Sequence, residues 1–451
     1  MQIAMQVIVI LLIAALALRG IAKPFFGLLG LLVVYIVQPG ELYPALAPLH
    51  LERTLAVFVL ASFFLHGNKL RFPLVTKWFL AFYGAMLVAI PLAFWQSNSM
   101  QFCIAFVEVV VFHLLIVALL TTEERIKQFV VLNVCLVGWL GGTALLMYAQ
   151  GVRIVTMGIE RSSGITSSGG DPNTLGITLV TAMPLEFLLM SKGNGRWVRL
   201  LGLGVFLLSL ETIITTGSRT SFFTFGVLVI LLILSDFRRK AKFLPILVVA
   251  IPLLWLAIPE QYKARYETVD NLKDDDSYQN RVLSWQGGVQ MFLHNPLTGV
   301  GPDNYTDANG SKYWPGQPKH WLNAHSLFFK LIGELGIVGV ITFGGYLVSL
   351  IMLNYKLARQ RKQQRGGIMA QKFPLYCNMS LFLLLITGYS AHNLYRSTWF
   401  ILGAITGAVG LLQVREMAAD PAPVRKQVVG AWVPGAEEVS PEAEAVSPSR
   451  S

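Results

Sequence analysis

Apolar runs recur along the whole chain and are separated by short polar segments. Most of these runs approach the roughly 20 residues that a helix needs to cross a bilayer. The alternating strands of about ten residues that mark an outer-membrane barrel are absent from the pattern. The runs predict helices at about 3–18, 24–37, 53–66, 75–94, 102–120, 128–148, 174–190, 198–214, 219–235, 242–258, 325–353, 376–391 and 398–414. Because two of these runs are short, the expected fold is an all-α polytopic integral membrane protein with about 12–13 transmembrane helices.

Composition supports a membrane location. Hydrophobic residues make up 54% of the chain and charged residues 14%, whereas soluble proteins carry about 25% charged residues. The net charge of +11 lies largely in short loops between apolar runs, as the positive-inside rule describes. We therefore expect a lipid bilayer around the protein and no nucleic-acid partner. Cys103, Cys135 and Cys377 all lie in apolar segments, and their spacing predicts neither a metal site nor a disulfide framework.

The connecting segments form two alternating classes. One class is basic, and its clearest member, 354–373, contains six Lys or Arg residues and no acidic residue. Basic loops of this kind face the cytoplasm. The other class includes 149–173, 259–324 and 392–397 and is expected to face the opposite side. In a Gram-negative host that side is the periplasm, and the protein would be a multi-pass protein of the bacterial inner membrane.

One polar segment, 259–324, is much longer than the others and contains eight acidic and six basic residues. Apolar side chains at helical spacing predict an amphipathic helix from Tyr278 to Leu293 within it. Asp276 and Ser277 are candidate caps, and Asn295-Pro296 is expected to end the helix. We expect this segment to be a large periplasmic loop with short helices that covers the membrane helices as a lid.

The expected organisation has four parts. Residues 1–258 carry ten transmembrane helices, 259–324 form the large loop, and 325–414 carry the C-terminal transmembrane helices. The last part, 415–451, is rich in Pro, Ala, Glu and Ser. Such a composition buries too little apolar surface to fold, so a disordered cytoplasmic tail is expected.

A histidine, His325, stands where the long polar segment meets an apolar helix. An imidazole has a pKa of about 6.5, so at neutral pH it is able to accept a proton from a hydroxyl group. The alternative is an interfacial histidine whose ring is satisfied by a backbone carbonyl. Both interpretations are compatible with the local sequence.

Three arginines are expected on the same side as His325. Arg219 begins a helix after a hydroxyl-rich segment, and arginine beside helix N-terminal amides suits a phosphate group. Its alternative role is an interfacial anchor. Arg281 lies in the predicted loop helix, where a solvated charge is the alternative. Arg161 precedes a run of small and hydroxyl residues that leads to Asp171-Pro172-Asn173, a segment also typical of a simple helix cap.

Several common catalytic signatures are absent. The chain contains no Walker A sequence, so no nucleotide energy source is indicated. It contains no GxSxG elbow. The run Asp274–Asp276 is interpreted as a solvated turn rather than a metal site. No cofactor is therefore expected from the sequence.

Together, the motifs resemble those of the O-antigen ligase and polymerase superfamily of bacterial membrane glycosyltransferases. The ligase-type signature is His-Ser, nine residues, Gly, two residues and Gly, present here as His325, Ser326, Gly336 and Gly339. The other motifs of the superfamily are present, in chain order, as Arg161…Gly164…Asp171-Pro172-Asn173, Thr216–Arg219, Arg281…Trp285 and Asn295–Gly301. The resemblance covers about 160 to 340.

This resemblance implies a metal-independent, inverting glycosyltransferase of lipopolysaccharide or polysaccharide biosynthesis. Its donor would be a glycan carried on undecaprenyl diphosphate, and its acceptor a hydroxyl group of the lipid A core, of a growing glycan or of a protein. His325 would be the catalytic base, and Arg219 and Arg281 would stabilise the charge of the departing diphosphate. Arg161 is a further candidate for contact with the donor.

Two other functions stay open on the sequence alone. A polymerase of the same superfamily would lengthen the glycan on its lipid carrier, whereas a ligase would move the glycan to another molecule. A transporter or flippase of lipid-linked sugars would share the fold and the phosphate-binding arginines. It would not need a base at His325.

Overall fold

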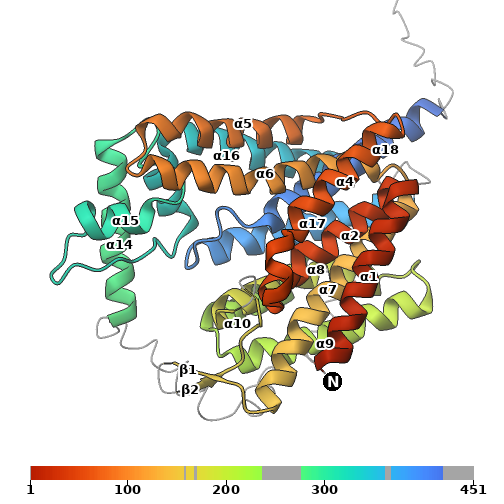
Figure 1. The fold of residues 1–451 in the computed structure, drawn as a ribbon, viewed down its shortest axis with the longest axis horizontal. Helices are drawn as coiled ribbons and strands as arrows, with labels where there is room; N and C mark the ends of the chain where they lie inside the picture. Colours follow the sequence, from red (N-terminus) through yellow and green to blue (C-terminus); the bar gives the residue numbers. More distant parts are fainter. Residues whose placement is uncertain (1, 157–158, 167–169, 236–275, 361–366, 420–451) are drawn as a thin grey trace, which may run out of the picture. The chain divides into compact units, whose positions relative to one another are not determined.

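The helices of the structure follow the apolar runs of the sequence (Figure 1). The structure is a computed structural model that describes residues 2–156, 159–166, 170–235, 276–360 and 367–419. Residues 1–413 form one compact unit, and 414–451 are assigned to a second. The expected helix at 242–258 and the expected tail from residue 420 lie outside the described residues.

The elements keep the order that the sequence predicts. They are α1 (Gln2–Ala22), α2 (Pro24–Val37), α3 (Pro39–Leu42), η1 (Pro44–Leu49), α4 (Leu51–Leu65), α5 (Leu74–Ala89), η2 (Ile90–Leu92), α6 (Gln96–Leu119), α7 (Glu123–Ala149), β1 (Ile154–Thr156), β2 (Ile159–Arg161), α8 (Pro172–Met190), α9 (Arg196–Thr216), α10 (Arg219–Leu234), α14 (Asp276–His294), α15 (Tyr305–Ala308), η5 (Asn309–Tyr313), α16 (Leu327–Gln360), α17 (Ile368–Gly388) and α18 (Ser397–Ala419). Helix α18 thus continues five residues into the segment expected to be a disordered tail.

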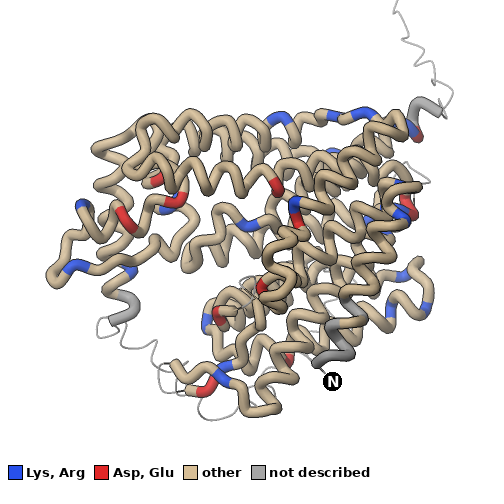
Figure 2. Tube along the Cα trace, viewed as in Figure 1, with Lys and Arg blue, Asp and Glu red and all other residues tan. Residues whose placement is uncertain are grey.

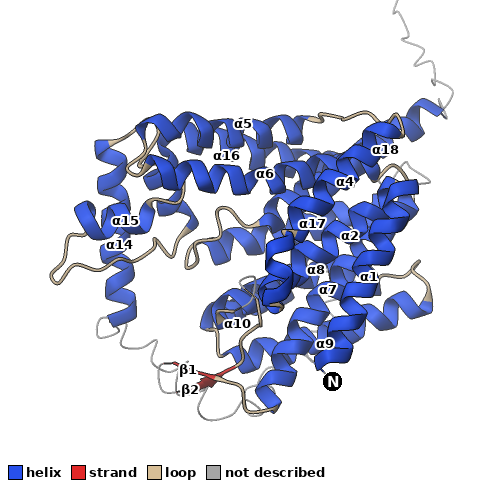
Figure 3. Ribbon diagram, viewed as in Figure 1, coloured by secondary structure: helices blue, strands red, loops and turns tan. Residues whose placement is uncertain are grey.

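The predicted fold class, an all-α polytopic membrane protein, is confirmed. Among the described residues, nine helices are long and apolar enough to cross a membrane by length and composition. Three shorter apolar helices, Ile10–Ala22, Pro24–Val37 and Arg219–Leu234, accompany them. The only strands in the described part are β1 and β2, which form one antiparallel pair (Figure 3). The protein is a multi-pass membrane protein.

Charged residues are sparse along the helices of the first unit (Figure 2). Acidic and basic residues occur together around α14 and α15, whereas most of the helical bundle carries neither. This distribution is what a bilayer imposes, because a charge at membrane depth is costly unless it faces the interior of the bundle.

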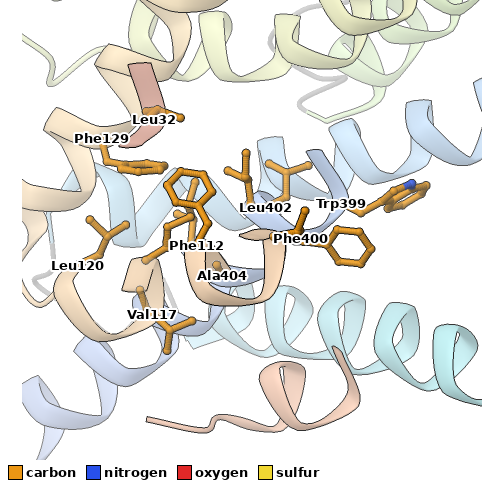
Figure 4. Close-up of a cluster of buried hydrophobic side chains, with 14 of the residues drawn as sticks. Leu32, Phe112, Val117, Leu120, Phe129, Trp399, Phe400, Leu402 and Ala404 are labelled. Atoms are coloured by element: carbon orange, nitrogen blue, oxygen red, sulfur yellow. The ribbon is translucent and has the colours of Figure 1, made fainter. Parts of the chain in front are cut away.

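The core of the bundle joins helices that are far apart in sequence. Phe112 of α6 and Phe129 of α7 lie close to Leu402 and Phe400 of α18 in one buried cluster (Figure 4). The two phenylalanine rings of α6 and α7 are 6.3 Å apart. Because lipid tails are as apolar as leucine, such contacts hold the bundle by close packing rather than by removal of water.

Helix α16 is broken at Gly336. The backbone of this residue has φ 57° and ψ −152°, which is not helical. A Cβ atom there would lie 2.6 Å from the carbonyl oxygen of Leu297, so only glycine fits. The break leaves backbone groups on either side without their usual partners within the helix.

A turn from the large loop provides the missing partners. The amides of Val300 and Gly301 donate to the carbonyls of Gly333 and Glu334, at 2.8 and 2.9 Å. Beyond the break, the amide of Ile337 donates to the carbonyl of Pro296 at 2.9 Å. The segment Asn295–Gly301 is therefore built into the broken helix, and the loop is fixed to the bundle through backbone hydrogen bonds.

The loop has its own helix and a small core. Helix α14 begins earlier than predicted, so Asp276 and Ser277 belong to the helix and are not caps that precede it. Its end at His294, directly before Asn295-Pro296, confirms the predicted stop. Met291 of α14, Tyr305 of α15 and Ala324 are buried together in a cluster separate from that of the bundle. The described part of the loop is thus a packed structure rather than a simple tether.

Candidate active site

The residues before His325 are held by helix α14. The indole Nε1 of Trp285 donates to the carbonyl of Ala324 at 2.8 Å. One residue earlier on α14, the hydroxyl of Ser284 donates to the carbonyl of Asn323 at 3.0 Å. These bonds fix the backbone that leads into His325, which adopts the left-handed conformation with φ 43°. Non-glycine residues rarely adopt this conformation, and it concentrates at functional sites.

The imidazole of His325 faces a second imidazole. Its ring centroid lies 5.2 Å from that of His392, with the two planes at 69°. His392 belongs to the segment between α17 and α18. Burial lowers the pKa of His325, and the nearby positive charges of Arg281 and Lys330 lower it further, while Asp171 acts in the opposite direction. His325 is therefore neutral at neutral pH and has a free electron pair for a proton.

The pKa of His392 is lowered even more strongly, to about 3. Burial is the main cause, followed by the positive charge of Lys330, with His325, Arg396 and Arg281 also contributing. His392 thus remains neutral over the physiological range. Because His392 is neutral, it adds no positive charge to those of Arg281 and Lys330 when His325 takes a proton.

The predicted arginines occupy different positions. Arg281, on α14, is close enough to act on the pKa of both histidines. Arg219 begins α10, and the hydroxyl of the next residue, Thr220, lies 3.0 Å from that of Ser390, two residues before His392. The structure therefore brings Arg281 to the histidine pair and places Arg219 on a helix end that contacts the segment carrying His392.

Arg161 has a different environment. Its side chain is 3% exposed. Its Nε donates to the carbonyl of Thr216 at 2.6 Å, and one Nη donates to Oδ1 of Asn173 at 2.8 Å. Arg161 thus ties strand β2 to the end of α9 and the beginning of α8. The guanidinium group connects these three elements.

The three small residues of the predicted signature are structural. Ser326 is fully buried, and its carbonyl accepts the amide of Lys330 at 3.1 Å in the first turn of α16. Gly336 forms the break in that helix. Gly339 is buried, and a Cβ atom there would collide with the side chain of Leu335 on the other side of the break. The signature therefore describes the junction that presents His325 as well as the histidine itself.

Comparison with known families adds a further observation. Residues 204–344 match the family model described as O-antigen ligase. The chain carries a domain of the O-antigen ligase-like superfamily. No curated protein matches the chain significantly. The match confirms the resemblance that the motifs indicated.

The O-antigen ligase domain contains most of the predicted site. Arg219, Arg281 and His325 lie within the matched residues, whereas Arg161 and His392 lie outside them. Arg161 is on β2 and His392 is in the segment after α17, so both lie on elements beyond the matched range. Among the described residues, no group of three His, Cys, Asp or Glu side chains is placed to hold a metal ion.

A cavity of about 470 Å³ adjoins the histidine pair. His392, Asp303, Lys330 and Arg396 line it together with residues of α2, α7, α8 and α18. A volume of about 300–1,000 Å³ is usual for pockets that bind small ligands. The cavity therefore provides room for part of a substrate next to His325.

A buried carboxylate organises one wall of this cavity. Glu334 of α16 is fully buried and accepts the hydroxyl of Tyr395 at 2.7 Å and the amide of Tyr305 at 3.1 Å. The Nζ of Lys330 lies 3.4 Å from Glu334 and 3.8 Å from Asp303. One carboxylate thereby connects α16, the loop and the segment that carries His392.

The sequence did not point to Lys330 or Glu334, and it indicated the segment His392–Arg396 only as a possible border of the acceptor path. Lys330 and Glu334 lie in an apolar helix, and Arg396 lies in a short segment between two helices. The available signal was their charge, because ionisable residues in or beside apolar segments are rare and usually face the bundle interior.

Proposed function

We propose that the protein is a glycosyltransferase that moves a glycan from undecaprenyl diphosphate to an acceptor hydroxyl group. The reaction would take place at the periplasmic face of the bacterial inner membrane. The O-antigen ligase domain supports the reaction class. The observation that carries the proposal is the neutral His325, held in a left-handed junction beside His392 and the cavity.

His325 would act as the general base. It would accept the proton of the acceptor hydroxyl group as that oxygen attacks the anomeric carbon of the donor sugar. A new bond forms between the carbon and the acceptor oxygen, and the bond between the carbon and the phosphate oxygen breaks. Its electron pair leaves with the diphosphate, and attack from the opposite face inverts the anomeric centre.

Arginines would stabilise the departing diphosphate. Arg281 lies near the histidines, and Arg219 begins a helix that contacts the neighbouring segment. Fixed positive groups stabilise charge that develops in the transition state more effectively than water does, because they need no reorganisation. Arg161 would support this arrangement indirectly by fixing the beginning of α8 and the end of α9.

Reconstitution in liposomes tests the function. Purified protein, given a glycan on undecaprenyl diphosphate and a candidate acceptor, is expected to form a covalent product. Transport of the donor across the bilayer without a new bond would instead favour a flippase. Growth of the glycan on its own lipid carrier would favour a polymerase, so the reducing end of the product separates the two enzyme activities.

The pH dependence of transfer should report the environment of His325. Because burial and Arg281 lower the pKa of His325, the group stays neutral to a lower pH than a free histidine, whose pKa is about 6.5. The acid limb, which is the decrease of kcat/KM on the acid side, should therefore have its midpoint at a pH below the pKa of free histidine. Asp171→Asn removes the charge that raises this pKa and should move the limb to lower pH, whereas Arg281→Gln should move it to higher pH.

Asp171→Asn is a suitable probe because asparagine can still cap α8. In the wild type, the Asp171 carboxylate accepts the amide of Thr174 at 2.8 Å, and asparagine caps helices about as well as aspartate. Initial rates across acidic to neutral pH measure the effect. If the acid limb of kcat/KM has the same midpoint pH in the wild type and in both variants, His325 is not the titrating base.

Trp285→Phe should lower the transfer rate by about 10- to 100-fold, because misplacement by about 1 Å can cost 100-fold. Phenylalanine preserves the stacking of this ring on Phe329, 5.2 Å away, but it removes the donor to Ala324. Initial rates at saturating donor measure the effect. Trp321→Phe is the matched control, since Trp321 is 56% exposed. A wild-type rate in Trp285→Phe would show that the hydrogen bond does not position His325.

A further inference from the structure

Arg396 is a cation in the cavity whose side-chain hydrogen bonds go to neutral oxygens. One Nη donates to the hydroxyl of Thr178 at 2.8 Å and the other to the carbonyl of Thr174 at 3.2 Å. Within the described part of the chain, no carboxylate lies within ion-pair distance of it. Burial lowers the pKa of Arg396 to about 10, while the carboxylate of Asp171, beyond ion-pair distance, acts in the opposite direction, so Arg396 stays charged. A charge removed from water normally requires a counter-charge, which points to an anionic ligand.

Two further features favour an anion near Arg396. Lys330, 5% exposed, lines the same cavity, although Glu334 and Asp303 partly balance its charge. The first two residues of α18, Ser397 and Thr398, also line the cavity. The unpaired amides at the beginning of a helix and the helix dipole favour negative charge. Two carboxylates oppose an anion here, that of Asp303 beside Lys330 and that of Asp171 near Arg396.

The remainder of the cavity is lined mainly by apolar residues, together with Asn133 and Thr181. Along α8 its lining changes from Thr174 and Thr178 to Ala182 and Leu185, over about 16 Å at 1.5 Å per residue. Ile401 and Leu402 of α18 contribute apolar side chains as well. The cavity therefore fits a ligand with a charged head and an apolar segment attached to it.

We infer that this cavity binds the diphosphate head of an isoprenoid lipid, with Arg396 as a cation in addition to Arg281 and Arg219. The first apolar units of the lipid lie along Ala182 and Leu185, and the rest of the chain extends beyond the cavity. The inference rests on the proposed function, because the donor and the leaving group of that reaction carry this head. It adds Arg396 to the binding residues and places the lipid between α8 and α18.

Direct binding measurements on the full-length protein in detergent test this inference without glycan transfer. Farnesyl diphosphate is the probe, and farnesol and inorganic pyrophosphate are its two halves. Wild-type protein is expected to bind farnesyl diphosphate at least about tenfold more tightly than either half, since a charge-assisted hydrogen bond contributes about 1.5–3 kcal/mol. Arg396→Gln should weaken the binding of farnesyl diphosphate by about tenfold or more and leave farnesol binding unchanged.

Two further variants control for a general loss of positive charge and for the geometry of the arginine side chain. Arg199→Gln removes an exposed positive charge at the other end of the helices and should bind the probe like the wild type. Arg396→Lys keeps the charge but loses the two-pronged geometry, and it should bind with intermediate affinity. If Arg396→Gln fails to fold in detergent, the comparison of Arg396→Lys with the wild type carries the test.

Wild-type affinity for farnesyl diphosphate in the folded Arg396 variants would overturn the inference. Pyrophosphate binding as tight as that of farnesyl diphosphate would overturn the lipid assignment and indicate a site for free phosphate. Failure of the proposed function is a separate result, namely no covalent product in liposomes. A protein that binds the probe through Arg396 but forms no product would retain the site and lose the proposed reaction.

Discussion

Replacing His325 with alanine is expected to reduce glycan transfer by about 10²- to 10⁴-fold, the usual contribution of a general base. The structure supports this effect because the imidazole is neutral, contacts His392 of the cavity lining and follows a backbone fixed by Trp285. Initial rates in liposomes, with matched amounts of protein in the membrane, measure the change.

The backbone at this position requires a second variant. Alanine is disfavoured at the φ of 43° that His325 adopts, whereas asparagine tolerates the left-handed region. His325→Asn therefore removes the base while keeping the junction. His294→Ala, which alters an exposed histidine at the end of α14, should transfer glycan at the wild-type rate. Full activity in His325→Asn would remove His325 from the mechanism.

Replacing Glu334 with alanine is expected to destabilise the protein by about 3–5 kcal/mol, as happens when one partner of a buried ion pair is removed. Glu334 is fully buried and accepts the hydroxyl of Tyr395 and the amide of Tyr305. Its loss leaves Lys330 with only Asp303, 3.8 Å away. The free energy of unfolding in detergent, from denaturant titration, measures the effect.

A double variant separates the effect of the ion pair from that of the other hydrogen bonds of Glu334. Lys330→Met combined with Glu334→Gln removes both charges and retains an amide that can still bond Tyr395. Since no buried charge is left unpaired, this variant should be more stable than Glu334→Ala. If Glu334→Ala unfolds at the same denaturant concentration as the wild type, the carboxylate does not organise this wall of the cavity.

The helices could be predicted from the sequence because the bilayer imposes one strong requirement. Every backbone group at membrane depth must be paired within a helix, so long apolar runs become helices. The run at 102–120 became α6, which begins at Gln96 and ends at Leu119, and the run at 128–148 became α7, which extends beyond the run at both ends. The ends differ because polar residues extend a helix beyond its apolar part.

The break in α16 was not predictable from the apolar pattern. Residues 325–353 read as one uninterrupted apolar helix, and Gly336 alone does not reveal a break. The break exists because Pro296 and Leu297, about 40 residues earlier in the chain, supply carbonyl groups to the amides beyond it. A contact between segments that are distant in sequence overrides the local pattern.

The candidate site was predicted in part. The motifs pointed to His325 and Arg281, which lie near each other in the structure. Arg161 bonds Thr216 and Asn173, and its contact with the donor stays a prediction. The segment His392–Arg396 was expected only as a possible border of the acceptor path, because one arginine in a short loop has many ordinary explanations. The fold places Arg396 in a cavity.

The insertion of Asn295–Gly301 into α16 has a consequence for protein engineering. A chimera that exchanges the large loop between relatives would ordinarily be joined at the ends of the polar segment, near residue 324. That junction would separate Pro296 from Ile337, its hydrogen-bond partner across the break. The natural unit of exchange therefore runs from the loop through Val338, and it carries His325 and Gly336 together. Substrate preference encoded in the loop would then be transferable only with the first part of the membrane helix.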